Sequence, residues 1–245
     1  MFFSMVIEDS LAKELCKFRE KVQDYDIKIV ERILHYYKPQ IILSKEYMQK
    51  YYSDKEILRR IIQSCPHIDF NNSLEQLAKN TVYKIILSKN RDDFPYINIT
   101  KDKIENNIAA TFNKNEDREK AKAHLKAIFE TANNLFIYDR YLCDKNNMEF
   151  FKQFCNECLP KKKISIFYPN EKGLKFTQGI LGGLNKICND WQIKENRDKT
   201  IKNQYIALHD RYIIVDRNIQ IIFTSGIHYL MDFEKDFTYI VRVLN

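Results

Sequence analysis

Hydrophobic residues recur with two different periods along residues 133–245. Alternation with a period of two, or a short unbroken apolar run, predicts a strand, whereas a period near 3.6 predicts a helix. Strands are predicted in "NLFIYDRYL", "KKKISIFYP", "WQIKE", "QYIALHDRYIIVD", "IQIIFTSG" and "DFTYIVRVL", and helices in "NNMEFFKQFCNECL" and 174–188. Because strands and helices alternate in this order, the segment predicts a layered α/β domain with a mixed sheet.

Residues 1–132 are richer in helical periodicity. All five glycines of the chain lie at or after Gly173, so no earlier turn depends on a glycine. Helices are predicted near 10–23, 25–37 and 116–131, from Thr100 to "AATF", and after the capping boxes that begin at Ser53 and Ser73. Strands are predicted in "FFSMVI", "QIILS" and "TVYKIILSKN". We therefore expect an α/β protein with a helix-rich N-terminal domain, 1–132, and a mixed-sheet C-terminal domain, 133–245.

Composition narrows the class of protein. Of the 245 residues, 44% are apolar, enough for a sizeable core, and the net charge of +7 suits an anionic partner without requiring one. No apolar run has membrane-spanning length, and the opening "MFFSMVIEDS" becomes acidic too early for a signal peptide. The six scattered cysteines do not form a disulfide scaffold, and Cys155 and Cys158 make a single CxxC without a second pair at zinc spacing. We expect a cytoplasmic protein that needs no cofactor.

Three side chains with phosphate chemistry interrupt the apolar stretch "ALHDRYIIVD". His209 and Arg211 are two residues apart, so on a strand both side chains face the same side, and Asp216 follows at the strand end. A neutral imidazole can attack phosphorus, and a guanidinium can hold the non-bridging oxygens through two parallel hydrogen bonds. Thr224 and Ser225 follow on the next predicted strand, where their hydroxyls would reach the same phosphate. The pattern predicts a phosphodiester site.

This stretch resembles the HKD motif of the phospholipase D superfamily, written H-x-K-x4-D, followed by a Gly-Ser segment. His209, Arg211 and Asp216 keep that spacing, and "NLFIYDRYL" resembles the opening strand of bacterial phospholipase D-like domains. The resemblance covers about 133–245. It implies a homodimer with two motifs around one active site, His209 as a nucleophile that forms a phosphohistidine, and His209 of the partner subunit as the general acid. Arg211 would stand in for the phosphate-binding lysine.

The chain departs from that family pattern at two places. Arginine replaces the lysine, and the Gly-Ser position reads Phe223-Thr224, with Ser225 and Gly226 shifted by one. The "HDR" version also resembles the phospholipase D-like domain at the C-terminus of proteins with microtubule-interacting and transport domains, which are thought to bind lipid or partners rather than cleave. These two departures support the alternative interpretation, a module that binds a phosphate-bearing ligand or a protein partner without cleaving it.

Further candidates lie around the motif and in the front of the chain. His228 and Lys235 follow the second strand of the motif and are secondary candidates for the site, against the simpler reading of loop and turn residues. In the N-terminal domain "VIEDS", "IILSKEY" and "IILSKNRDD" loosely resemble the strand-end acids of PIN-like nucleases. A divalent metal would then be bound by Asp9, Glu46, Asp92 and Asp93. A module for dimerisation or partner contact is the simpler account of this domain.

Two functions are consistent with these patterns. The first is a metal-independent phosphodiesterase, a nuclease in a homodimer, since the net charge of +7 favours nucleic acid over lipid. The family resemblance also fits an effector of phage defence or of a mobile element. The alternative is a non-enzymatic phospholipase D-like module that binds a phosphate-bearing ligand or a protein partner within a larger assembly.

Overall fold

The computed structural model shows a mixed α/β protein made of two compact units, Met1–Asn107 and Ile108–Asn245. It describes residues 3–21, 24–36, 38, 40–52, 55–105, 108–139, 142, 145–169, 178–197, 205 and 209–244. The division falls ahead of the boundary predicted at residue 132, because a strand and a helix that follow Asn107 belong to the second unit. Among the described residues, no helix combines the length and the apolar character needed to cross a membrane.

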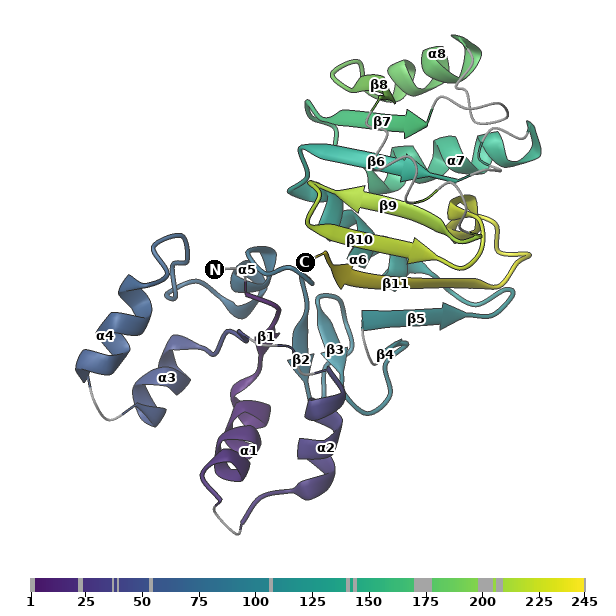
Figure 1. The fold of residues 1–245 in the computed structure, drawn as a ribbon. Helices are drawn as coiled ribbons and strands as arrows, with labels where there is room; N and C mark the ends of the chain where they lie inside the picture. Colours follow the sequence, from purple (N-terminus) through teal and green to yellow (C-terminus); the bar gives the residue numbers. More distant parts are fainter. Residues whose placement is uncertain are drawn as a thin grey trace. The chain divides into compact units, whose positions relative to one another are not determined.

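The first unit is built on a small parallel sheet. Strand β1 (Val6–Ile7) pairs with β2 (Ile86–Ser88), which pairs with β3 (Tyr96–Asn98), and all three strands are buried. Between β1 and β2 the chain forms α1 (Asp9–Arg19), α2 (Ile27–Tyr36), α3 (Lys45–Tyr51), α4 (Lys55–Gln63) and α5 (Leu74–Lys79) (Figure 1). Parallel strands are usually covered on both faces, which is why β1 and β2 fall on the apolar runs "MVI" and "IIL".

Two predictions for the front of the chain are wrong. The run "QIILS" contributes only an isolated parallel bridge, from Ile42 to Val6, rather than a strand. No helix runs from Thr100 to "AATF": the hydroxyl of Thr100 donates to Asn98 Oδ1 at 2.7 Å, and two strands follow, β4 (Ile104–Glu105) and β5 (Ala109–Phe112). Of the two capping boxes, Ser73 accepts a hydrogen bond from the backbone N–H of Gln76 as expected, and Ser53 lies outside the described residues.

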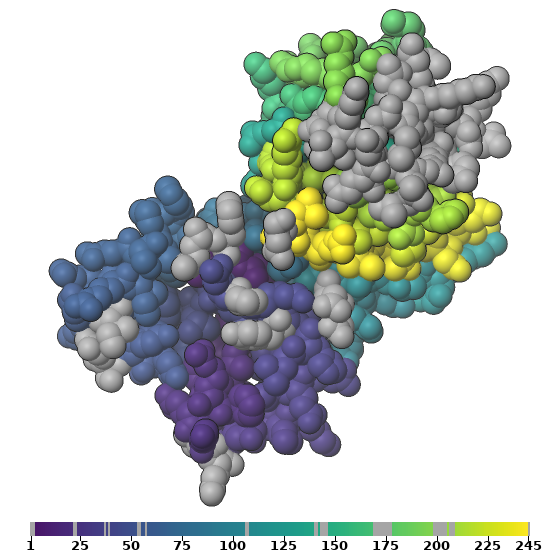
Figure 2. Space-filling model, in the orientation of Figure 1, coloured from purple at the N-terminus to yellow at the C-terminus, as the bar shows by residue number. Residues whose placement is uncertain are grey.

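The second unit is organised around an eight-stranded mixed sheet, of which seven strands lie after Asn107 and one, β4, lies just before it. Its strand order is β4-β5-β11-β10-β9-β6-β7-β8, in which β6, β7 and β8 are parallel and β9, β10, β11 and β5 are antiparallel to their neighbours. The strands are β6 (Asn134–Tyr138), β7 (Ser165–Pro169), β8 (Gln192–Asn196), β9 (Arg211–Val215), β10 (Ile219–Phe223) and β11 (Phe237–Val243). In Figure 2, β10 and β11, coloured yellow-green to yellow, form part of the visible surface of this unit.

Helices cover one face of this sheet. Helix α7 (Lys145–Cys158) connects β6 to β7 and packs against α6 (Glu119–Glu130), α8 (Gln178–Ile187) and the short 3₁₀ helix η2 (Ile227–Leu230) (Figure 1). The amphipathic segments predicted at 116–131 and "NNMEFFKQFCNECL" are therefore confirmed as helices. Helix α6 has a buried face: His124 is fully buried, and its Nδ1 lies 2.8 Å from the hydroxyl of Tyr239.

Aromatic residues cover the opposite face of the sheet. Its cluster consists of Phe136, Tyr138, Tyr205, Tyr212 and Ile214, and we call this side the aromatic face. Since side chains alternate along a strand, Tyr212 and Ile214 place Arg211, Ile213 and Val215 on the helix-covered side. Arg211 is therefore the first residue of β9, and its side chain points to the helix-covered face of the sheet.

Candidate functional site

Four strands bring Arg211, Thr224 and Ser225 to one edge of the sheet. Arg211 at the start of β9 pairs with Phe223 at the end of β10, and Tyr212 pairs with Tyr138 at the end of β6. Phe223 pairs in turn with Tyr239, two residues into β11. The residues next to these ends therefore share one border of the sheet, which we call the Arg211 edge: Asp139, Arg211, Thr224 and Ser225.

The guanidinium of Arg211 is held by two groups. Its Nε lies 3.7 Å from Oδ1 of Asp139, and its Nη1 donates to the backbone carbonyl of His209 at 3.1 Å. The Asp139 side chain is fully buried, and its other oxygen accepts a hydrogen bond from the N–H of Ile227 at 3.1 Å. Because a buried carboxylate needs a cation or donors nearby, Asp139 and Arg211 position each other. The Arg211 side chain remains 19% exposed, so part of it faces solvent.

Asp139 was not among the residues picked out from the sequence. Asp139 directly follows the buried strand β6, in "NLFIYDRYL". A polar residue after an apolar run usually predicts only a turn. Only the pairing of β6 with β9 shows that this carboxylate meets Arg211 and the start of η2. Strand pairing between distant segments cannot be read from local spacing, so the sequence carried no signal for this contact.

His209 lies just ahead of β9 and is exposed. The prediction placed it within a long strand that starts near Gln204, but β9 begins at Arg211, and 206–208 lie outside the described residues. Strand alternation therefore does not fix the direction of its ring, and it is the carbonyl of His209 that contacts Arg211. The structure brings the two residues together at the Arg211 edge, with the imidazole on an accessible residue.

Asp216 lies at the other end of β9, away from the Arg211 edge. Its Oδ1 accepts from the N–H of Asn134 at 2.8 Å, and both of its oxygens lie 3.2 Å from the N–H of Asn133. Its own N–H donates to the carbonyl of Asn134 at 2.9 Å. The backbone of Asp216 has a positive φ of 48°, which aspartate tolerates better than most residues do. Asp216 therefore joins the β9–β10 turn to the start of β6. Among the residues predicted for the phosphodiester site, Asp216 is the one that lies away from the Arg211 edge.

The hydroxyls of Thr224 and Ser225 lie at the Arg211 edge, as expected from the hairpin. Thr224 is exposed, and Ser225 Oγ donates to the carbonyl of Asp236 at 3.4 Å. Gly226 follows them and is needed for space, since an added Cβ would come within 2.3 Å of Cε1 of His228. At the shifted Ser225-Gly226 pair, the His228 ring therefore packs directly on the backbone of Gly226.

The two secondary candidates differ in accessibility. His228 lies in η2, is 3% exposed and packs edge-on against Tyr229 with ring centroids 4.5 Å apart. It is therefore a core residue beneath the Arg211 edge rather than a loop residue. Lys235 is exposed in the turn before β11, as expected of a solvated turn.

A buried arginine that the sequence did not indicate holds this turn in place. Arg118, fully buried ahead of α6, donates from Nη1 to the carbonyls of Tyr229 and Asp232 and from Nη2 to that of Lys235. Its guanidinium also lies over the ring of Phe237, 5.6 Å from the centroid. One cation thus binds three carbonyls of the segment that leads from η2 to β11, although "NEDREK" resembles any charged helix start.

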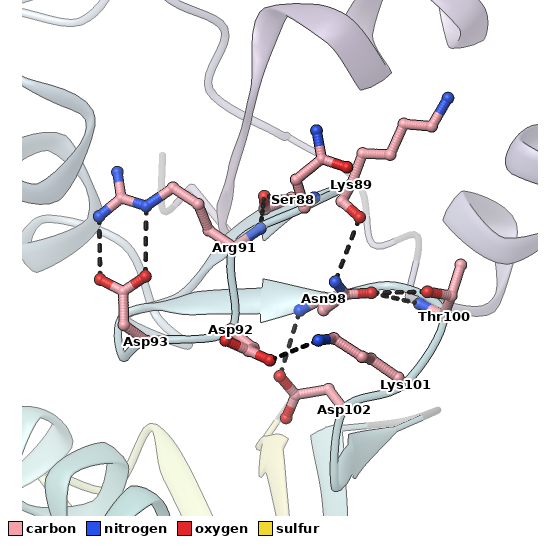
Figure 3. A network of polar contacts seen from close by, with 10 residues as sticks. Ser88, Lys89, Arg91, Asp92, Asp93, Asn98, Thr100, Lys101 and Asp102 are labelled. Carbon is pink, nitrogen blue, oxygen red and sulfur yellow. Dashed lines mark hydrogen bonds and ion pairs between the residues drawn. The ribbon is translucent and has the colours of Figure 1, made fainter.

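The alternative metal site in the first unit does not assemble. Asp9 and Glu46 line the same hollow, of about 730 Å³, but Asp92 pairs with Lys101 at 2.8 Å and Asp93 with Arg91 at 2.9 Å (Figure 3). Within the described part of the chain, no group of three or more histidine, cysteine, aspartate or glutamate side chains could hold a metal ion. The acids after β2 are therefore ion-paired turn residues.

The CxxC pair is sealed in the core of the second unit. Cys155 and Cys158 are 1% and 0% exposed on α7. Burial raises the pKa of the Cys158 thiol to about 12 and raises that of Cys155 well above its ordinary value. Since the thiolate is the form that binds metals and exchanges disulfides, both thiols are inert near neutral pH.

Comparisons with known proteins identify no family for this chain. No family model matches it, and no curated protein matches it. Among solved structures, one match is to a chain described as "Structure of TrmBL2, an archaeal chromatin protein, shows a novel mode of DNA binding", with a TM-score of 0.23 and 9% identity. The match covers 80% of this chain and 57% of that chain. A TM-score this low does not establish a common fold.

Proposed function

We propose that this chain is a metal-independent phosphodiesterase acting on nucleic acid, with His209 as nucleophile and Arg211 as the phosphate-binding group. The observation that carries the proposal is the fixed guanidinium at the Arg211 edge, held by Asp139 and directly beside the exposed His209. A cation that is already oriented before substrate arrives stabilises developing negative charge without reorganising. The hydroxyls of Thr224 and Ser225 at the same edge are further donors to a phosphate oxygen.

The reaction proceeds in two displacements. An imidazole nitrogen of His209 attacks phosphorus, the P–O bond to the leaving group breaks, and the leaving oxygen takes a proton from His209 of the partner subunit. Water then attacks the phosphohistidine, gives its proton back to the partner's His209 and releases a phosphate monoester with a free His209. One chain carries one motif, so this scheme requires a homodimer.

The test is cleavage of labelled single- and double-stranded DNA and RNA in excess chelator. His209→Ala is expected to lower the rate by about 10²- to 10⁴-fold, the range for removing one acid–base group. His67→Ala is the matched control, because His67 is also exposed but lies in the first unit. Chelator-resistant cleavage that survives His209→Ala would overturn the assignment, and so would a strictly monomeric active species in sedimentation.

A second candidate, a non-enzymatic module that binds a phosphate-bearing ligand or a protein partner, is favoured by one observation. The carboxylate of Asp139 beside Arg211 offsets part of the charge that a transition state would need. A module of this kind binds oligonucleotide or phosphoprotein, loses binding in Arg211→Ala, and shows no cleavage in any variant. Asp139→Asn then separates the two functions, since freeing Arg211 from its counter-charge strengthens binding without creating turnover.

A further inference from the structure

A hollow of about 530 Å³ lies over the aromatic face of the second unit, on the side of the sheet opposite α6 and α7. Its floor is formed by Phe136 and Phe167, and three basic residues, Lys194, Arg197 and Arg217, stand around it. The volume falls within the range of about 300–1,000 Å³ found for small-molecule sites.

The floor is a stacked pair of phenylalanine rings. Phe136 on β6 pairs with Phe167 on β7, which pairs with Lys194 on β8, so the three side chains form one row across the sheet. The two rings lie 4.6 Å apart with an interplanar angle of 12°. Phe136 is nearly buried, whereas Phe167 is only partly buried and presents ring surface to the hollow.

Positive charge surrounds this floor. Arg217 lies in the β9–β10 turn with its guanidinium 5.6 Å from the ring centroid of Phe136, and it is exposed. Lys194 and Arg197 are exposed on the β8 side. Glu195 is the one acid that lines the hollow within the described residues, so the lining carries a net charge of three minus one, or +2. Asn196 adds an amide.

We infer that this hollow binds one nucleotide of a single-stranded nucleic acid, with its base against Phe167 and its flanking phosphates at Lys194 and Arg217. Every base has a flat π-face, and alternating bases and phosphates match a floor of aromatic rings with cations at its rim. A lipid tail would not need three cations, and an acidic peptide would not need a stacked aromatic floor. The inference rests on the proposed function for its choice of nucleic acid, and it assigns a role in holding the strand rather than in cutting it.

The experiment is fluorescence anisotropy of a labelled oligothymidylate with the full chain in chelator. Phe167→Leu is expected to weaken binding by about 5- to 100-fold, the range for losing one base stack. Arg217→Gln is expected to weaken it and to reduce its dependence on salt, because one phosphate contact is lost. Lys186→Gln on α8 is the matched control, since Lys186 is exposed on the helix-covered side and changes net charge by the same amount.

Competition by inorganic triphosphate separates a nucleotide site from a simple anion site. If triphosphate displaces the oligonucleotide and Phe167→Leu binds like wild type, the inference is wrong. If Arg217→Gln and Lys186→Gln weaken binding equally, only net charge matters and the inference is again wrong. Arg217 is exposed, so its variant tests the site even where Phe167→Leu does not fold.

The variant His209→Ala keeps this test apart from the test of the proposed function. We expect His209→Ala to bind the oligonucleotide as wild type does while failing to cleave it. Loss of binding in Phe167→Leu without cleavage by any form upholds the inference and refutes the enzyme. If cleavage depends on His209 while Phe167→Leu and Arg217→Gln bind as wild type does, the proposed enzyme is upheld and the inference of a nucleotide site is refuted.

Discussion

Replacing Asp216 tests whether this residue of the motif acts in chemistry or in structure. Its carboxylate accepts from the N–H groups of Asn133 and Asn134 and from the Asn134 side chain, at 2.8–3.2 Å. A lost hydrogen bond to a charged group costs about 1.5–3 kcal/mol when buried, and we take about 1 kcal/mol for each backbone donor because water reaches this half-buried turn. An alanine in the left-handed region adds about 1 kcal/mol. Asp216→Ala is therefore expected to lose about 3 kcal/mol of stability.

Two further variants divide that loss into its parts. Asp216→Gly also loses the hydrogen bonds but accepts the φ of 48° freely, so its loss is about 2 kcal/mol. Asp216→Asn keeps an acceptor for Asn134 and tolerates this φ, so its loss is about 1 kcal/mol. The order of stability is therefore wild type, asparagine, glycine, alanine.

The assay is urea unfolding followed by the fluorescence of Trp191. This is the single tryptophan of the chain, it is buried in the second unit, and its Nε1 donates to the carbonyl of Pro160 at 2.9 Å, so its signal reports that unit. Variants that unfold at the wild-type urea concentration would refute the structural role. If such variants also lost cleavage as completely as His209→Ala, Asp216 would belong to the chemistry.

Two further predictions concern buried cations. Burial lowers the pKa of Lys84 to about 8 from an ordinary 10.5, so its charged form destabilises the fold fully below pH 8, and this cost disappears as the pH rises from 8 to 10.5. Lys84→Met should therefore be more stable than wild type by about 3 kcal/mol at pH 7 and equal to it near pH 10.5. The measurement is urea unfolding followed by circular dichroism, and a stability advantage that grows with pH would contradict the sign. Arg118→Met leaves three part-buried carbonyls without their donor and should lose about 3 kcal/mol in the Trp191 assay, whereas an unchanged midpoint would show that the arginine does not hold the turn.

Local patterns predicted the elements of the second unit better than their boundaries. The strands that became β6, β7, β9, β10 and β11 and the helices α6 and α7 were indicated by periodicity alone, because one face of each is buried. The start of β9 was placed too early, since "QYIAL" continues the apolar pattern although the paired strand begins at Arg211. The helix predicted from Thr100 to "AATF" rested on Thr100 as its cap, whereas pairing of β5 with β11 selects a strand.

The candidate site was predictable only where it depends on sequence spacing. The proximity of Arg211 to Thr224 and Ser225 follows from one hairpin, and the structure places them at one edge. Asp139 reaches this edge, and Arg118 the turn before β11, from segments far away in the sequence, through strand pairing and burial that no local pattern reports. Asp216 kept the motif spacing but serves the backbone of a neighbouring strand, which spacing alone does not distinguish from catalysis.

The position of β11 in the sheet has a consequence for how the second unit is made. Strand β5 pairs with β11, which is the last of the described strands in chain order. Until residues 237–243 have been synthesised, residues 109–112 can pair only with β4, and the border of β10 that β11 later covers stays open. A nascent chain stalled before residue 237 should thus be vulnerable to proteases and to strand exchange, and completion of the last strand closes the unit in a single late step.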